Sequence, residues 1–220
     1  MKLYSGPLSL FSRKVEIALA EKGLAYEREM VPFTQAAGYS PRHPAVLAAN
    51  PKAQVPVLVD GEQTLFDSTL IFEYLEDAYP EPALFPQGAA ARADCRGIEL
   101  AADEILLPLV ARLMYRTEPA DPDPVRQGQI EADGLKAEAA ITEYYRTMDE
   151  RLIGQEYFCD KFSVADIAMF MTILFANRLG APSISNFVVL DQWFSRVKAR
   201  PSAGKAAEEI AEADRQLSPT

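Results

Sequence analysis

Residues 50–75 read NPKAQVPVLVDGEQTLFDSTLIFEYL, and this stretch decides the fold of the first part of the chain. Residues 55–59 and 64–66 are short apolar runs, and Asp60-Gly61 between them is a signal for a hairpin turn. A helix is predicted next, because apolar side chains then recur at helical spacing: Leu70, Ile71, Tyr74 and Leu75. The stretch therefore predicts two antiparallel strands closed by a helix.

The residues upstream of this stretch alternate between strand and helix signals. Residues 2–4 are a short apolar run that ends at a Gly-Pro turn, which indicates a strand. Apolar residues at helical spacing follow, and then a second strand is indicated at 26–31 and a short helix near 45–47. The order β-α-β-(loop/helix)-β-β-α predicts a small α/β domain over residues 1–79.

The chain changes character after this domain. Residues 80–91 are rich in proline and glycine, which is the composition of a linker. Every periodic segment after it is helical, so residues 92–220 are predicted to form an all-α domain. Five helices are expected, the first of them kinked at Pro108: residues 92–116, 125–152, 163–179, 188–199 and 203–216.

The third of these helices is predicted to lie in the core of the helical domain. Its apolar side chains cover all faces, with a continuous stripe from Ile167 to Phe175. Ser163 and Asp166 at its start match the capping-box pattern, in which two side chains satisfy N–H groups of the first turn. Because buried N–H groups need such partners, both residues are assigned a structural role.

Charge and composition argue against several classes of function. The 220 residues include 22 Lys and Arg against 32 Asp and Glu, and the net charge of −10 disfavours binding to nucleic acid or to anionic membranes. His43 is the only histidine, and Cys95 and Cys159 have no metal-ligand spacing, so we expect no metal. Since no signal peptide or bilayer-spanning apolar run is recognisable, a cytoplasmic location is expected.

Three short segments carry the strongest signals for chemistry. Ser9 begins the first helix, whose free N–H groups and partial positive charge favour an anion. Pro56 interrupts a strand, and because proline cannot donate to the ladder, a cis Val55–Pro56 bond is predicted. Asp67 and Ser68 begin another helix. Capping alone explains each helix start taken singly, but not the combination of the three segments.

These segments, in this order, resemble the cytosolic glutathione S-transferase family over essentially the whole chain. The first strand, turn and helix are similar to the family's thioredoxin-like start, residues 50–58 to its cis-proline segment, and Asp67-Ser68 to its glutathione clamp. The capping-box helix and Trp193 also match. The resemblance implies a thioredoxin-like α/β domain, an all-α domain and a homodimer. The matches lie at residues 2–5, 9–23, 50–58, 67–75, 162–168 and 193.

The resemblance implies roles for the site residues. Ser9 matches the catalytic serine of the serine-type theta, phi and zeta classes, so its hydroxyl would hydrogen-bond the glutathione thiolate, while Ser12 stays open as the alternative donor. Lowering a thiol pKa near 8.5 by about two units needs roughly 2.7 kcal/mol, the order that one hydroxyl and a helix N-terminus supply. The other glutathione contacts would come from Gln54, Val55, Asp67, Ser68, His43 and Arg42.

The second substrate is expected to be a small, hydrophobic electrophile bound between the two domains. The candidate lining residues include two arginines, which hint at an anionic or carbonyl-bearing substrate. They also include aromatic residues, for which core packing is the alternative role. The candidate lining residues are Phe11, Phe33, Arg112, Tyr115 and Arg116. The predicted function is therefore a detoxifying transfer of glutathione, the co-substrate, to an electrophile.

Two alternative functions stay open on the same resemblance. One is a non-catalytic binding protein of the stringent starvation protein type, although that group lacks a hydroxyl where this chain has Ser9. The other is a glutathione-dependent isomerase or dehalogenase. The Ser-Ser-Cys signature of the maleylacetoacetate isomerases is replaced here by Ser9-Leu10-Phe11, which departs from that activity. A fold alone does not separate these functions.

Overall fold

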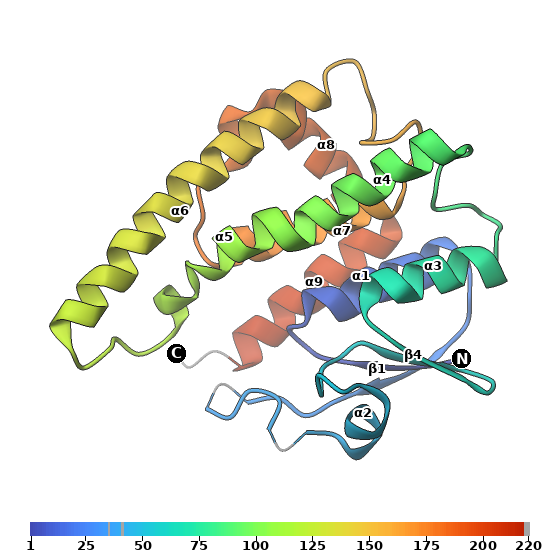
Figure 1. Ribbon diagram of the computed structural model, residues 1–220, viewed down its shortest axis with the longest axis horizontal. Coiled ribbons are helices and arrows are strands. Elements are labelled where there is room, and N and C mark those ends of the chain that lie inside the picture. Colours follow the sequence, from blue (N-terminus) through green and yellow to red (C-terminus); the bar gives the residue numbers. More distant parts are fainter. Residues whose placement is uncertain (35, 41, 218–220) are drawn as a thin grey trace. The chain divides into compact units, whose positions relative to one another are not determined.

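The computed structural model groups the chain into two compact units (Figure 1). One unit comprises residues 1–84 together with the chain from residue 198 onward, and the other comprises 85–197. The last helix thus belongs by its contacts to the first unit, whereas the sequence placed it in the helical domain; the domain limits themselves stay a prediction. The structure describes residues 1–34, 36–40 and 42–217, so the end of the predicted second domain, residues 218–220, lies outside the described residues.

The first unit is built on a four-stranded mixed sheet. Its strand order is β2-β1-β3-β4, in which β1 and β2 are parallel and the other pairs antiparallel. The predicted hairpin joins β3 and β4, and Gly61 in its turn has a φ of 57°, a left-handed conformation that glycine adopts without steric cost. The strands are β1 (Lys2–Ser5), β2 (Glu27–Met30), β3 (Val57–Asp60) and β4 (Gln63–Phe66).

Helices cover both faces of this sheet. The first and third lie on one face and the second on the other, and the last packs against the first (Figure 1). Leu3 and Leu58 pair across the sheet and are fully buried, while Tyr4 and Val57 join an apolar cluster with Val46 of the second helix. The helices are α1 (Leu10–Glu21), α2 (Pro44–Ala49), α3 (Ser68–Ala78) and α9 (Pro201–Leu217).

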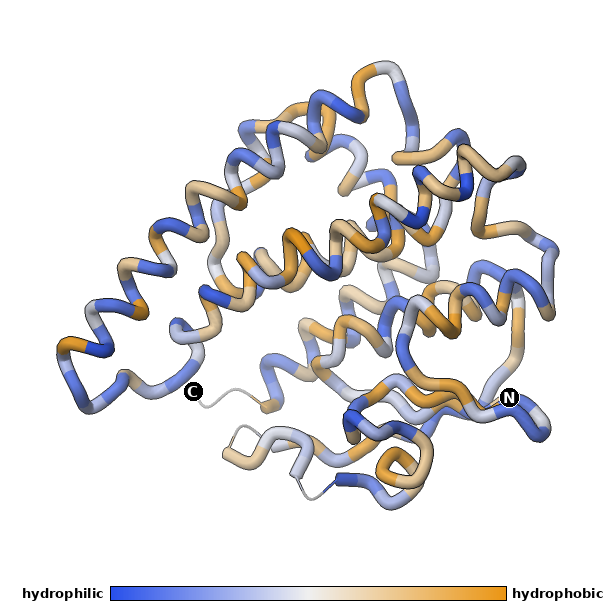
Figure 2. Tube along the Cα trace, viewed as in Figure 1, coloured by the Kyte–Doolittle hydropathy of each residue, from blue (hydrophilic) through white to orange (hydrophobic). Residues whose placement is uncertain are grey.

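The second unit is helical, and its core helix is the predicted one. Every residue from position 164 to 173 is buried, and the capping box of Ser163 and Asp166 is formed. The longest helix, α6, alternates between hydrophilic and hydrophobic positions along its length (Figure 2). In the described part of the chain, no helix is long and apolar enough to cross a membrane. The helices are α4 (Ala89–Ala101), α5 (Leu107–Ala111), α6 (Pro124–Arg151), α7 (Val164–Arg178) and α8 (Val188–Lys198).

The helix expected over residues 92–116 is divided, which corrects the sequence prediction. It begins at Ala89, within the predicted linker, and a π-helical turn at Ala102–Leu106 separates α4 from α5. Pro108 is the second residue of α5. Its ring would clash with the carbonyl group four positions earlier, that of Glu104, if the α-helix were continuous. The wider π turn at that point accommodates the proline.

Candidate functional site

One end of the sheet brings together the three segments that the sequence analysis singled out. Tyr4 pairs with Val57 in the ladder, and Val57 pairs with Phe66. Since these pairs are antiparallel, β1 and β4 end here while β3 begins here. The turn into α1, the segment before β3 and the start of α3 therefore adjoin the same end of three neighbouring strands.

Ser9 is the N-cap of α1 and is half-buried. Its Oγ accepts a hydrogen bond from the backbone N–H of Ser12 at 3.2 Å. A serine hydroxyl that accepts one hydrogen bond still has its own hydrogen to donate. Ser12, by contrast, is fully buried, and its Oγ accepts from the backbone N–H of Gly6 at 3.3 Å. Of the two serines, Ser9 is the one accessible to a ligand.

The segment before β3 has the predicted backbone. The Val55–Pro56 bond is cis, which confirms the prediction. Asn50 organises the preceding turn, because its Nδ2 donates to the carbonyl of Gln54 at 2.7 Å and its Oδ1 accepts from the N–H of Lys52 at 2.9 Å. Gln54 is exposed and Val55 half-buried, so both border the end of the sheet.

The start of α3 has an unusual backbone. Asp67 has φ 74° and ψ 128°, a region that residues other than glycine rarely occupy and that is found at functional sites more often than elsewhere. Its Oδ1 accepts from the N–H of Thr69 at 3.0 Å, so it caps the helix. Asp67 is exposed, whereas Ser68 is buried. The first turn of α1 contains no acidic residue and its cap is a serine, which leaves its positive end available to an anion, whereas the Asp67 carboxylate lies at the start of α3.

Arg42 and His43 precede the short helix α2. The Nδ1 atom of His43 accepts from the N–H of Ala45 at 3.3 Å, and its Nε2 lies 2.9 Å from Oε1 of Glu29. The imidazole ring also lies against Tyr4, with 5.2 Å between the ring centres. Both nitrogens of His43 are thus engaged within the protein, while Arg42 is exposed to solvent.

A network of buried charges, which the sequence did not indicate, supports the turn that carries Ser9. Arg13 and Glu16 form an ion pair of 2.7 Å with almost no exposure to solvent. Glu16 accepts a hydrogen bond of 2.5 Å from Ser5 at the end of β1, and Arg13 donates at 3.3 Å to the carbonyl of Pro7 in the turn. The only local signal was the i, i+3 spacing of Arg13 and Glu16.

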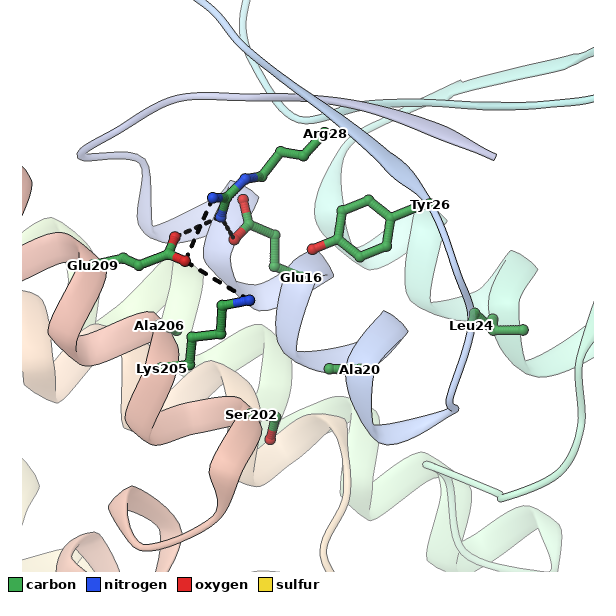
Figure 3. Close-up of a pocket in the computed structure, with 9 residues that line it drawn as sticks. All are labelled: Glu16, Ala20, Leu24, Tyr26, Arg28, Ser202, Lys205, Ala206 and Glu209. Carbon is green, nitrogen blue, oxygen red and sulfur yellow. Dashed lines mark hydrogen bonds and ion pairs between the residues drawn. The ribbon is translucent and has the colours of Figure 1, made fainter.

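The network extends to β2 and α9 (Figure 3). Arg28 contacts Glu16 at 3.0 Å and Glu209 at 2.5 Å. Arg13 contacts Glu209 at 2.5 Å. Although burial works in the opposite direction, hydrogen bonds from Arg28 and Arg13 lower the pKa of Glu209. Burial and the charge of Glu16 raise the pKa of Tyr26 to about 12. These residues border a cavity of about 350 Å³, lined by Glu16, Ala20, Leu24, Tyr26, Arg28, Ser202, Lys205, Ala206 and Glu209.

Two of the residues predicted for the electrophile site belong to the first unit. Phe11 is half-buried in the first turn of α1, with the Lys14 ammonium 5.2 Å from its ring centre. Phe33 follows β2, and its ring meets that of Tyr39 edge to face at 4.8 Å. Both aromatic residues thus have packing partners inside their unit.

The other three predicted electrophile residues belong to the second unit. Arg112 is exposed at the end of α5, and Tyr115 is half-buried. Arg116 donates to the carbonyl of Gly180 at 2.6 Å and pairs with Glu138 at 2.7 Å. Its guanidinium is therefore engaged in holding the unit together. Among the described residues, no group of three or more His, Cys, Asp or Glu side chains could hold a metal ion.

Comparison with known proteins agrees with this arrangement. Residues 3–83 match the family model of the glutathione S-transferase N-terminal domain, and residues 104–201 that of the C-terminal domain. A maleylacetoacetate isomerase of Pseudomonas aeruginosa is 37% identical over 202 residues, which cover 88% of this chain and 86% of that protein. A stringent starvation protein A homolog of Coxiella burnetii is 41% identical over 98 residues, which cover 44% of this chain and 43% of that protein.

A solved structure gives the same result for the fold. It is a glutathione S-transferase of Methylobacillus flagellatus with glutathione bound, and it matches with a TM-score of 0.76 and 24% identity over 93% of this chain and 98% of that one. The thioredoxin-like domain followed by a helical domain, expected from the sequence, is thus confirmed. Since the two family models and the 37% identical relative each cover large parts of it, the chain belongs to the glutathione S-transferase family.

Proposed function

We propose that the chain transfers the thiolate of glutathione to a small, hydrophobic electrophile, with Ser9 hydrogen-bonding the thiolate. The observation that carries this proposal is the half-buried Ser9 hydroxyl at the start of α1, at the end of the sheet where the other two segments meet. Its Oγ accepts from Ser12, which leaves its hydrogen for the sulfur. The hydroxyl and the helix N-terminus both stabilise the thiolate over the thiol, so they lower the thiol pKa.

The dimensions of this end of the sheet suit a tripeptide. Adjacent strands lie about 4.8 Å apart, so β1 and β4, with β3 between them, are about 10 Å apart. An extended tripeptide reaches a similar distance, roughly 10 Å. With the sulfur at Ser9, the cysteinyl backbone would pair with Val55 beside Gln54, and the γ-glutamyl amine and carboxylate would meet Asp67 and Ser68.

The opposite end of glutathione would be held less tightly. Its glycyl carboxylate needs a cation or a hydrogen-bond donor, for which Arg42 and His43 are the candidates. We favour Arg42, because the two nitrogens of His43 already contact Ala45 and Glu29. Arg42 is exposed, so its contribution would be that of a solvated ion pair, about 1 kcal/mol or less.

Arg13 is proposed as a positioning residue for this site. It donates to the carbonyl of Pro7, two residues before Ser9, and is itself held by Glu16 and Glu209. Because Glu16 also binds Ser5, one buried ion pair fixes both sides of the turn that leads from β1 to α1. A turn held in this way keeps the Ser9 hydroxyl in one place, which stabilising a developing charge requires.

Calorimetric titration of the full chain with glutathione tests the proposal. We expect binding by the wild type and about tenfold weaker binding by Asp67→Asn, because the substitution removes a charge-assisted hydrogen bond to the amine, worth roughly 1.5–3 kcal/mol. The melting temperature should stay the same, since Asn is nearly as good an N-cap as Asp. Asp77→Asn is the matched control, because Asp77 is an exposed carboxylate at the other end of α3.

Two results would contradict the proposal. A wild-type chain that does not bind glutathione has no glutathione-dependent activity of any kind. Unchanged affinity in Asp67→Asn, with intact folding, would make Asp67 only the helix cap that its bond to Thr69 shows.

A second candidate function is glutathione-dependent isomerisation, which the 37% identity to a maleylacetoacetate isomerase favours. The sequence Ser9-Leu10-Phe11 in place of Ser-Ser-Cys disfavours it. The two reactions differ in their use of glutathione, because conjugation consumes one molecule per turnover whereas isomerisation returns it. Measuring free thiol during assays with a panel of electrophiles and with maleylacetoacetate therefore separates them, and a halide electrode would detect dehalogenation.

The likeness to a stringent starvation protein A homolog keeps a non-catalytic binding role as the alternative, which a chain inactive in every assay would favour. A cytoplasmic homodimer stays a proposal as well. Exposed apolar side chains of the helical unit, among them Leu100, Ile105 and Leu135, support a protein contact there.

A further inference from the structure

The cavity in Figure 3 lies within the first unit and apart from the Ser9 end of α1. Its walls come from α1, from the segment that leads into β2 and from α9. Ala20, on the α1 wall, lies roughly 16 Å along the helix from Ser9, because each residue of an α-helix advances the axis by about 1.5 Å. The volume of about 350 Å³ is at the small end of the range of ligand pockets, roughly 300–1,000 Å³. The cavity is thus a separate space of the size that a small molecule fills.

The two carboxylates of this cavity, those of Glu16 and Glu209, already have protein donors. Each accepts hydrogen bonds from Arg13 and from Arg28. Arg13 is almost fully buried, so a cationic ligand that took over either carboxylate would deprive a buried guanidinium of a partner. The carboxylates therefore do not favour a cation as the occupant.

Two donors on the cavity wall are left over. Within the described part of the chain, no hydrogen bond engages the Tyr26 hydroxyl, and its raised pKa of about 12 means that it keeps its hydrogen at neutral pH. The Lys205 ammonium lies 3.9 Å from Oε1 of Glu209, which is beyond hydrogen-bond distance. Both side chains extend toward Glu16 from opposite sides of the cavity (Figure 3). They can therefore donate to one and the same ligand group.

Charge and apolar lining together define the class of ligand. Basic side chains outnumber carboxylates by one in this cluster, so an anion restores the balance. A carboxylate accepts hydrogen bonds from an ammonium and a hydroxyl at the same time. The apolar part of the lining suits a ligand whose remaining atoms are apolar. The basic residues are Arg13, Arg28 and Lys205, and the apolar lining residues are Ala20, Leu24 and Ala206.

We propose that this cavity binds a small organic carboxylate with an apolar body, such as an aromatic acid. Its carboxylate accepts hydrogen bonds from Lys205 and Tyr26, and its body lies against the apolar lining. The Lys205 side chain is 75% exposed, so the ion pair stays partly in contact with water and the affinity is modest. For benzoate we expect a dissociation constant of about 1 mM. This inference does not depend on glutathione binding.

Two-dimensional amide NMR of the full chain tests the site by titration with sodium benzoate, at constant ionic strength and with glutathione in excess. The glutathione keeps benzoate out of the site proposed above. We expect saturable shifts of the amide signals of Tyr26, Arg28 and residues 202–206. Benzamide has the shape of benzoate without the charge, and inorganic phosphate has the charge without the apolar body. Each should bind about fivefold more weakly than benzoate, or more weakly still.

Two variants test the residues that carry the proposal. Lys205→Met should weaken benzoate binding about fivefold, which is the effect of losing one partly solvated ion pair. Lys136→Met is the matched control and should bind as the wild type does, because Lys136 is also 75% exposed and pairs with Asp133 at 3.1 Å in the other unit. Ala20→Leu should abolish binding by filling the cavity. Ala20 is at an exposed helical position, where leucine costs little stability.

Three results would overturn the proposal. The first is an absence of saturable shifts at benzoate concentrations about tenfold above the expected dissociation constant. The second is equal binding of benzamide or of phosphate, which would remove the charge or the apolar body from the recognition. The third is shifts confined to the surroundings of Ser9 and Asp67, which would place benzoate at the other site. A chain that does not bind glutathione but shows the shifts at Tyr26 and residues 202–206 would contradict the proposed function and support this site.

Discussion

The helices α1 and α7 begin with similar sequences, a serine followed three positions later by a second polar residue, but the two starts have different surroundings. At α7, Ser163 and Asp166 are both buried. The Asp166 carboxylate there accepts four hydrogen bonds, all from protein groups. At α1, Ser9 is half-buried and accepts one hydrogen bond from the backbone of Ser12. The same capping pattern is therefore structural in one case and open to a ligand in the other.

The difference comes from what surrounds each helix start. α7 is apolar on all sides and enters the core, so its first turn must be satisfied by protein groups, including the indole N–H of Trp193 at 2.8 Å from Asp166. α1 begins at the end of a sheet, where the neighbouring segments are turns. A capping motif thus becomes a candidate ligand site only where the surrounding segments leave the start of the helix exposed on one side.

Asp166→Ala is expected to have the largest effect. It removes the acceptor of four hydrogen bonds and leaves buried donors on Phe158, Ser163 and Trp193 without a partner. We expect a loss of about 4 kcal/mol or more in the free energy of unfolding, measured by urea denaturation. Asp160→Ala is the control, since Asp160 is exposed in the same segment, and should change stability by about 0.5 kcal/mol or less. A loss of only about 1 kcal/mol in the free energy of unfolding of Asp166→Ala, which is typical of an ordinary N-cap, would contradict the difference between the two helix starts.

The pH dependence of stability probes the same carboxylate with a smaller effect. Burial raises the pKa of Asp166 to about 6, against its hydrogen bonds. Between about pH 4 and pH 6 the folded state therefore binds more protons than the unfolded state, and the contribution of Asp166 to stability falls as the pH rises, by roughly 2–3 kcal/mol.

Unfolding of the wild type and of Asp166→Asn at pH 4, 5 and 7 measures this contribution, because Asn does not titrate. We expect the stability advantage of the wild type to shrink as the pH rises through this window. An advantage that grows with pH would show that the four hydrogen bonds outweigh burial and that the pKa of Asp166 is lowered.

Ser9→Ala and Ser163→Ala compare the two caps directly, with the smallest expected effect. Ser9→Ala should lower the kcat of glutathione conjugation tenfold or more at pH 6.5, about 1.4 kcal/mol, because a donor to the thiolate is lost. The deficit should decrease as the pH rises, since the thiol then ionises without help. Ser163→Ala should instead lower the melting temperature and leave kcat unchanged. Full activity of Ser9→Ala at pH 6.5, with Ser12→Ala inactive, would make Ser12 the donor.

Local patterns predicted many of the elements and part of the candidate site. The hairpin at Asp60-Gly61, the buried helix α7 with its capping box, and the cis Val55–Pro56 bond all follow from neighbouring residues, and all three are confirmed. The two helix starts at Ser9 and Asp67 were also predicted, and both residues cap their helices. Such features depend on backbone geometry within a few residues, so the sequence contains what determines them.

Features that depend on distant partners were missed. The periodicity of α1 predicted an apolar buried face but not the burial of Arg13 and Glu16. Arg13 also pairs with Glu209, which lies almost two hundred residues later in the chain. The helix near Pro108 was expected to continue with a kink at the proline. It is instead divided by a π turn just before the proline, and this turn relieves the clash between the proline ring and the preceding carbonyl group.

The sequence by itself determined the order of most helices and strands, which helix is buried, and the three segments that carry polar chemistry, because hydrophobic period, turn residues and caps act over short stretches. Only the tertiary structure decided that these segments meet at one end of a sheet, that Ser9 rather than Ser12 is accessible, and that Arg13 of α1 pairs with Glu209 of α9. Register and packing set these relations, and both depend on contacts between residues that the chain order does not place together.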